Sequence, residues 1–293
     1  MLIARVIADS TGLSASLDAA VEALSEAGIG AEARELPALG MGVAEIAVDS
    51  RDATAVRAAI DAHIAPSDVL IADHVPRLPK VFVSDMDSTM ITAECIDELA
   101  DFAGIKAQIA EITERAMQGE LDFASALTER VGLLRDLSED AIAQCLATRI
   151  APMPGAKVLV ETLKAKGCRT VLVTGGFHQF ADPVAEMLGF QRVVANRLGV
   201  DAGKLTGGLV GPICDSSTKK ATLIEELGLL GEGAMSLATG DGANDIPMIE
   251  AAHYGVAFCA KPKARAAANG WVDRGDLTAV LRLLGVPEAE WVR

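Results

Sequence analysis

The fold is decided by one stretch, Lys80–Thr89, which reads K-V-F-V-S-D-M-D-S-T. Its first half is a short, nearly all-apolar run, typical of a parallel strand buried on both faces. Asp85 and Asp87 follow directly, where this strand is expected to end. Ligands bind outside the carboxyl ends of strands in open parallel sheets. One carboxylate there could act as a nucleophile and the other as a general acid and base, although the same letters also suit a turn or helix cap.

The chain downstream alternates between apolar runs and helical patterns. Residues from about 91 to 150 read as helical throughout, with no strand-like run. The predicted strands that follow are R-T-V-L-V-T, R-V-V-A-N, M-S-L-A-T and, last, G-V-A-F-C, with a hairpin turning near residues 201–204. This alternation predicts an α/β fold with a Rossmann-like, doubly wound parallel sheet. The helical block at about 92–150 is then a cap inserted after the first strand of that sheet.

The chain upstream has a different pattern. Residues 1–75 predict the order β-α-β-β-α-β, which is the split ferredoxin-like arrangement of a small α+β domain. The two middle strands are expected in E-A-R-E-L-P-A-L and G-V-A-E-I-A-V-D. The segment H-V-P-R-L-P-K, with two prolines, reads as a linker. We therefore expect an N-terminal domain at 1–75, resembling ACT-type regulatory domains, and a second domain at 76–293.

Composition limits the function classes. The chain has 293 residues, 51% of them hydrophobic, and a formal net charge of −15, which argues against nucleic-acid binding. Its five cysteines form no C-x-x-C pair, so neither a disulfide framework nor a zinc site is expected. No signal peptide and no membrane-spanning apolar stretch is recognisable. These features predict a soluble, cytoplasmic protein.

Three further segments follow predicted strands and carry polar groups suited to phosphate or metal. Thr174 precedes Gly175 in T-G-G, where backbone N–H groups can approach a phosphate closely. Lys219 opens a predicted helix and could reach an anion. Asp241 and Asp245 lie in G-D-G-A-N-D, whose carboxylates suit Mg²⁺. Each segment alone also reads as an ordinary turn or solvated lysine, but separate turns would rarely place all of them around one crevice in this order.

The ordered set resembles the haloacid dehalogenase (HAD) superfamily of phosphohydrolases, and all four of its motifs are present. Three longer stretches, D-M-D-S-T-M-I-T-A-E-C-I-D-E-L-A, V-T-G-G-F and G-D-G-A-N-D-I-P-M-I, resemble the phosphoserine phosphatases within it. The resemblance covers about residues 80–285. It implies hydrolysis of O-phospho-L-serine to serine and phosphate, the last step of serine biosynthesis, through an aspartyl-phosphate.

The resemblance also implies roles at the crevice. Asp85 would attack phosphorus, and Asp87 would protonate the leaving oxygen and then deprotonate the attacking water. Mg²⁺ would be held by the carboxylates of Asp85 and Asp241 and by the backbone carbonyl of Asp87. The residues implied to hold the phosphoryl group, the metal waters or one another are Thr174, Gly175, Lys219, Asn244 and Asp245.

The cap would supply specificity. The resemblance implies that Glu94 pairs with the substrate ammonium and that Arg130 grips its carboxylate. Met117 and Phe123 would close over the site and exclude water. Without the resemblance, the two charged residues would read as surface charges and the two apolar residues as core.

Some points of the sequence leave alternatives open. Thr174 stands where these phosphatases commonly have serine, and Met86 stands where they commonly have phenylalanine. Lys220 directly follows Lys219, so the lysine that reaches the phosphate could be either of the two, although the spacing to Thr222 and Leu223 favours Lys219. An alcohol could replace water at the aspartyl-phosphate, which would make the protein a phosphotransferase. A sensor of phosphorylation or amino acids is the alternative from another class. Residues 1–75 could bind serine, and the protein could form a homodimer.

Overall fold

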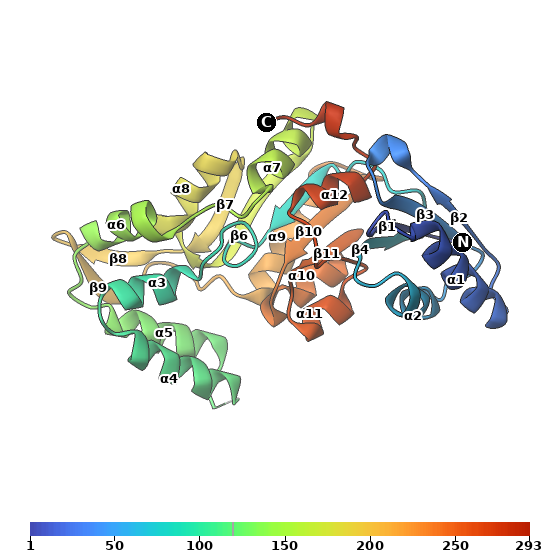
Figure 1. The fold of residues 1–293 in the computed structure, drawn as a ribbon. Helices are drawn as coiled ribbons and strands as arrows, with labels where there is room; N and C mark the ends of the chain where they lie inside the picture. The colour runs from blue at the N-terminus through green and yellow to red at the C-terminus, as the bar shows by residue number, and fades with distance from the viewer. Residues whose placement is uncertain (119) are drawn as a thin grey trace.

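The computed structural model of the chain describes residues 1–118 and 120–293. One ten-stranded sheet runs through the molecule (Figure 1). Its strands in spatial order are β2 (Ala31–Glu35), β3 (Val43–Val48), β1 (Leu2–Ile7), β4 (Asp68–Ala72), β12 (Gly270–Val272), β11 (Tyr254–Phe258), β10 (Ser236–Gly240), β5 (Val81–Ser84), β6 (Arg169–Phe177) and β7 (Arg192–Asn196).

The six strands from β12 to β7 are parallel to one another, which confirms the predicted doubly wound sheet. Along β5, Phe82 packs into one apolar cluster, and Val81 and Val83 pack into another on the opposite face. Both faces are therefore covered by helices, as parallel sheets require. One face carries α7 (Ala156–Ala165), α8 (His178–Leu188) and α12 (Thr278–Leu283), and the other carries α9 (Ser216–Gly228), α10 (Ile246–Ala251) and α11 (Pro262–Ala267).

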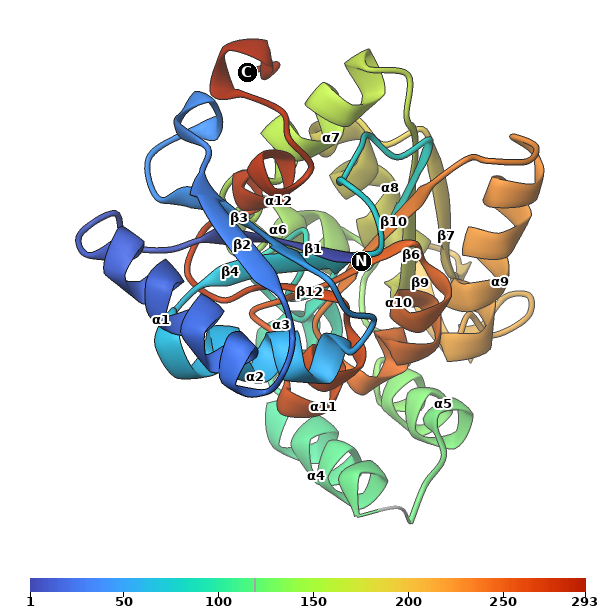
Figure 2. The ribbon, with the colours of Figure 1, turned by 90° about the vertical axis from the view of Figure 1, so that its right-hand side faces the viewer.

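The first four strands form the antiparallel part of the sheet, and their order along the chain is β-α-β-β-α-β. The helices α1 (Leu13–Glu26) and α2 (Ala53–His63) cover one face, and α12 contacts the other (Figure 2). The predicted strand E-A-R-E-L-P-A-L is confirmed only up to Glu35, in β2, and is wrong beyond it, because Pro37–Leu39 forms a 3₁₀ turn. Proline fixes φ and removes the N–H donor that a ladder position needs.

The antiparallel and parallel parts meet where β4 pairs with β12, Leu70 with Gly270 and Val69 with Trp271. The carboxylate of Asp68 accepts three backbone N–H groups from residues 273–275, at 2.8, 2.8 and 3.2 Å. The sequence did not predict β12, since G-V-A-F-C was expected to be the last strand. As a result, the junction between the two halves is a shared sheet in addition to a connecting segment.

The helical cap consists of α3 (Cys95–Phe102), α4 (Lys106–Met117), α5 (Phe123–Leu133) and α6 (Asp140–Arg149), as predicted for this insert. A separate hairpin of β8 (Leu198–Asp201) and β9 (Lys204–Leu209) packs against α5. The backbone N–H of Asp136 donates to the carbonyl of Leu205, and the N–H of Leu205 donates to Leu137, both at 2.9 Å. The hairpin was predicted, but its attachment to the cap was not.

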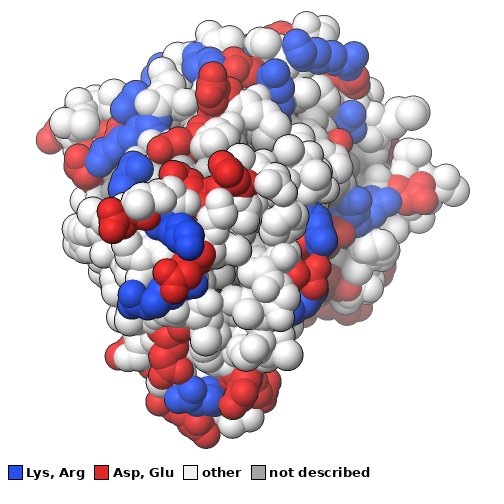
Figure 3. Space-filling model, turned by 90° about the vertical axis from the view of Figure 1, so that its left-hand side faces the viewer, with Lys and Arg blue, Asp and Glu red and all other residues white. Residues whose placement is uncertain are grey.

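None of the described helices is both long and apolar enough to cross a membrane. On the face drawn in Figure 3, Lys and Arg side chains are interspersed with Asp and Glu side chains. This face therefore has no continuous basic stretch of the kind that nucleic-acid binding uses.

Candidate active site

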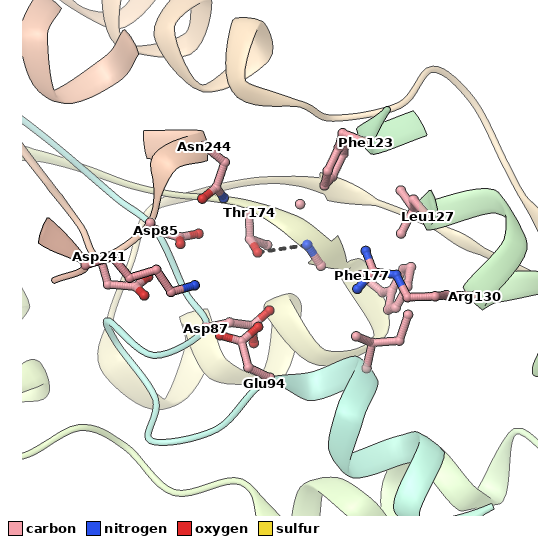
Figure 4. Close-up of a pocket in the computed structure, with 15 residues that line it drawn as sticks. Asp85, Asp87, Glu94, Phe123, Leu127, Arg130, Thr174, Phe177, Asp241 and Asn244 are labelled. Carbon is pink, nitrogen blue, oxygen red and sulfur yellow. Dashed lines mark hydrogen bonds between the residues drawn. The ribbon is translucent and has the colours of Figure 1, made fainter. Parts of the chain in front are cut away.

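The carboxyl ends of three neighbouring strands bring the predicted site together. Asp85 follows β5, Asp241 follows β10 on one side, and Thr174 lies near the end of β6 on the other. They open into a cavity of about 140 Å³ beneath the cap (Figure 4). The predicted residues that line it are Asp85, Asp87, Glu94, Phe123, Arg130, Thr174, Gly175, Asp241 and Asn244.

Lys219 lies behind this cavity and contacts two carboxylates. Asp215 caps α9 and forms a capping box with Thr218, which places Lys219 about one turn into the helix. Its Nζ lies 2.6 Å from Oδ1 of Asp85 and 2.6 Å from Oδ1 of Asp245. Burial alone would lower the pKa of Lys219, but the two carboxylates raise it above its ordinary value. The ammonium is therefore a fixed positive charge, whereas the neighbouring Lys220 is exposed.

Asp85 is buried, and burial raises its pKa well above the ordinary value while Lys219 opposes the rise. Asp245 supports the neighbouring loop, because its Oδ2 accepts the backbone N–H groups of Asp241 at 3.2 Å and Gly242 at 3.0 Å. Burial and Asp245 raise the pKa of Asp241 to about 6. The three acids crowd together, so a cation between them would relieve their mutual repulsion.

Carboxylate oxygens of Asp85, Asp241 and Asp245 lie within 4.8 Å of one another. Hard oxygen donors at this spacing fit Mg²⁺. The oxygens of Asp245 already contact Lys219 and two backbone N–H groups, so Asp245 fits a supporting position better than a ligand position. Asp85 and Asp241 are the carboxylates that fit direct coordination.

Asp87 sits on the loop between β5 and α3, where Ser88 adopts a positive φ of 56°. The backbone N–H of Cys95, at the start of α3, donates to Oδ1 of Asp87 at 3.2 Å. Burial, with a smaller contribution from Glu94, raises the pKa of Asp87 to about 7. A Cβ atom at Gly176 would lie 3.1 Å from Oδ2 of Asp87. A carboxyl group that titrates near neutrality suits a general acid and base.

The Thr174–Gly176 segment is held by a residue that the sequence analysis missed. The Thr174 hydroxyl accepts the N–H of Gly176 at 2.9 Å. Buried Asn196, at the end of β7, donates from Nδ2 to the carbonyl of Gly175 at 2.7 Å and accepts the N–H of Cys214 at 2.8 Å. One amide thus fixes both this segment and the loop before α9. In the sequence, Asn196 is only the last residue of the predicted strand R-V-V-A-N.

The cap brings three of its four predicted residues to the cavity. Glu94 occupies the N-cap position of α3, and its carboxylate accepts a hydrogen bond from the Ser88 hydroxyl at 2.7 Å. Arg130 is half-buried, and burial lowers the pKa of its guanidinium. A Cβ atom at Gly175 would lie 3.0 Å from the Phe123 ring, so α5 closes against the strand end. Met117 ends α4, but its side chain lies outside what the structure describes.

Among the described residues, six more line the cavity without having been predicted: Ile96, Leu127, Gly176, Phe177, Gly242 and Lys261. The glycines and Phe177 belong to segments that the sequence already marked. Ile96 and Leu127 follow from the helical spacing of the cap residues. No pattern in the sequence distinguishes Lys261, which follows β11, from a surface lysine.

Comparison with known proteins gives a consistent result. Residues 82–250 match the family of haloacid dehalogenase-like hydrolases. The chain is 43% identical over 210 residues to the phosphoserine phosphatase of Albidiferax ferrireducens, an alignment that covers 70% of this chain and 89% of that protein.

Two solved structures are also similar. The crystal structure of a probable phosphoserine phosphatase from Vibrio cholerae has a TM-score of 0.75 and 32% identity, and covers 99% of this chain and 87% of that one. The structure of a phospho-aspartyl intermediate analogue of phosphoserine phosphatase has a TM-score of 0.63 and 36% identity. It covers 70% of this chain and 99% of that one.

Proposed function

Because the chain belongs to the haloacid dehalogenase-like hydrolases and, within them, to the phosphoserine phosphatases, it is a phosphatase, and we propose that it hydrolyses O-phospho-L-serine with Asp85 as the nucleophile. The observation that carries this proposal is the contact between Asp85 and Lys219 at the carboxyl end of the parallel strand β5. Asp87, with a pKa of about 7, lines the same cavity.

The reaction divides into two displacements at phosphorus. A carboxylate oxygen of Asp85 attacks, the bond from phosphorus to the serine oxygen breaks, and Asp87 delivers its proton to that oxygen. Asp87, now a carboxylate, takes a proton from water, whose oxygen attacks the aspartyl-phosphate and releases phosphate and Asp85. Lys219, the Thr174 hydroxyl and the backbone at Gly175 offset charge on the phosphoryl oxygens.

Mg²⁺ is the proposed cofactor, held by the carboxylates of Asp85 and Asp241 and by the backbone carbonyl of Asp87. When bound, the ion neutralises charge on the phosphoryl oxygens. Asp245 keeps the Asp241 loop in place through its two backbone N–H contacts. Asn244 lies on the same loop and lines the cavity, where it can hold metal-bound water.

The cap residues are proposed to recognise the serine part of the substrate. Glu94 offers a carboxylate for its ammonium, and Arg130 offers a guanidinium for its carboxylate. Both line the cavity with the predicted catalytic pair. Phe123 covers Gly175 from the cap side, so a bound substrate is shielded from water there.

The test is phosphate release from O-phospho-L-serine by the purified protein, with Mg²⁺ and with a chelator, beside phosphothreonine and sugar phosphates. We expect metal-dependent release that favours phosphoserine. We also expect the Asp85→Asn variant to lose turnover, because an amide is not a nucleophile, while circular dichroism shows it folded. Normal turnover in that variant would contradict the assignment, and release from other esters alone would discard the substrate.

Residues 1–75 are proposed to act as an ACT-like regulatory domain, on the support of their β-α-β-β-α-β order. Serine binding by this part and formation of a homodimer stay predictions. A cytoplasmic location is also proposed, and it agrees with five cysteines that form no disulfide among the described residues.

A further inference from the structure

We propose that Lys261 is a positioning residue for the phosphoryl group, which draws phosphate toward the Asp241 side of the cavity and opposes excess cation binding there. The proposal rests on the proposed phosphatase function, since that function supplies the anion. Acidic side chains outnumber basic ones at the cavity wall. Asp85, Asp87, Glu94 and Asp241 contribute carboxylates to the lining, and Arg130 and Lys261 contribute the basic side chains.

The basic residues near the cavity differ in what they already contact. Lys219 lies behind the wall and contacts both Asp85 and Asp245. Arg130 lies on α5, where the proposed function assigns it to the substrate carboxylate. Lys261 is exposed, and within the described part of the chain no carboxylate lies within 4.0 Å of its ammonium. Its positive charge is therefore not neutralised by an ion pair with any of the described residues.

The backbone of Lys261 is held in place next to the metal-side loop. Its N–H donates to the carbonyl of Asp241 at 2.9 Å, and its own carbonyl accepts the N–H of Arg265 at 3.0 Å. Arg265 is anchored in turn, 2.7 Å from Asp273, 3.0 Å from Asp61 and over the ring of Trp271. The start of α11 is thus fixed on the core, and only the lysine side chain is left to adjust.

The position of Lys261 gives its charge two opposite effects. Its backbone N–H contacts the carbonyl of Asp241, and its side chain lines the same cavity as the carboxylate of Asp241. An ammonium in this cavity that no ion pair neutralises favours a phosphate dianion and disfavours Mg²⁺. A merely structural lysine would move neither affinity, or would weaken both through misfolding. A variant that binds phosphate more weakly and Mg²⁺ more tightly therefore distinguishes an electrostatic role of Lys261 from a structural one.

The experiment compares Lys261→Gln with Lys263→Gln, which alters an exposed lysine in the first turn of α11 that does not line the cavity. Calorimetry measures binding of Mg²⁺ alone and of inorganic phosphate. In Lys261→Gln we expect phosphate binding to weaken by about 3–5-fold and Mg²⁺ binding to tighten by about 2–5-fold, the range of exposed charge pairs. In 0.5 M salt, the affinities of the variant for phosphate and for Mg²⁺ should be close to those of the wild-type protein in the same salt. Lys261→Arg should restore the wild-type affinities.

Turnover adds a second readout. For Lys261→Gln, KM should rise to a similar extent for phosphoserine and for an alkyl phosphate that lacks the amino-acid group, with little change in kcat. Equal behaviour of the two glutamine variants in calorimetry would overturn the proposal. Absence of phosphoserine hydrolysis by the wild-type protein would instead contradict the proposed function, and the binding measurements would still decide the role of Lys261.

Discussion

The ammonium of Lys219 lies 2.6 Å from the carboxylate of Asp85, and both side chains are buried. A buried pair of this kind contributes little net stability, but loss of one partner leaves the other charge without compensation. Asp245 makes the arrangement a triad, since it contacts the same ammonium.

Lys219→Met is expected to lower the free energy of unfolding by about 3–5 kcal/mol in the absence of Mg²⁺, because two buried carboxylates lose their partner. Turnover should fall by at least about 100-fold, since the same charge is proposed to offset charge on the phosphoryl oxygens. Urea denaturation and phosphate release measure the two effects. Lys220→Met, at the exposed neighbouring position, is the control. Similar losses in both variants would mean that Lys219 has no special role.

Asn196→Ala should affect both stability and catalysis. It leaves the carbonyl of Gly175 and the N–H of Cys214 without their partner, which costs about 1–3 kcal/mol. We expect kcat to fall by about 10-fold, because the segment with Thr174 and the loop that leads to Lys219 lose their common support.

The matched control for that variant is Asn269→Ala. Asn269 also bridges two backbone groups, the N–H of Gly255 and the carbonyl of His253, but neither of these residues lines the cavity, whereas Gly175 does. It should lose stability with kcat near the wild-type value. If kcat falls equally in both variants, the effect of Asn196 on catalysis is only general destabilisation.

Arg130→Ala is expected to raise KM for phosphoserine by about 100-fold, in line with loss of a charge-assisted bidentate contact. Hydrolysis of an alkyl phosphate without a carboxylate should change by less than about 3-fold. Steady-state kinetics on both esters provide the comparison. Arg115→Ala, in the same cap but paired with Glu129 at the surface, should leave both substrates unaffected. Equal loss on both esters would make Arg130 a structural residue.

The pH dependence follows from Asp87, whose pKa is raised to about 7 by burial and by Glu94. The acid step needs the protonated form, so kcat/KM for alkyl phosphate should fall as pH rises through about 7. Glu94→Gln removes one cause of the raised pKa and should move this fall to lower pH.

Glu98→Gln, on α3 but paired with Arg149, is the control for that shift. It should leave the profile where the wild-type protein has it. The pH profiles of all three proteins are compared on the ester without an ammonium group, so that binding by Glu94 does not interfere. An unchanged profile in Glu94→Gln would show that its charge does not reach Asp87.

Most of the parallel sheet was predictable because its strands are short apolar runs that end in chemically distinctive residues such as Asp85 and Thr174. The strand β12 was not, because three residues are too short to show a period and its pairing with β4 joins segments some 200 positions apart. Asn196 and Lys261 escaped prediction for a related reason. Their significance lies in contacts to Gly175 and Asp241, and nothing in their own sequence surroundings reports those contacts.

The pairing of β4 with β12 also determines which edges of the sheet are free to pair with strands of other chains. A parallel sheet that ended at β12 would present a row of open backbone donors and acceptors, which invites aggregation. Here β4 occupies that row, and the free edges of the sheet are β2 and β7. The N-terminal part thus covers the edge of the parallel sheet that bears the active site. Its removal would expose β12 as an aggregation-prone edge strand, even if every residue of the active site stayed in place.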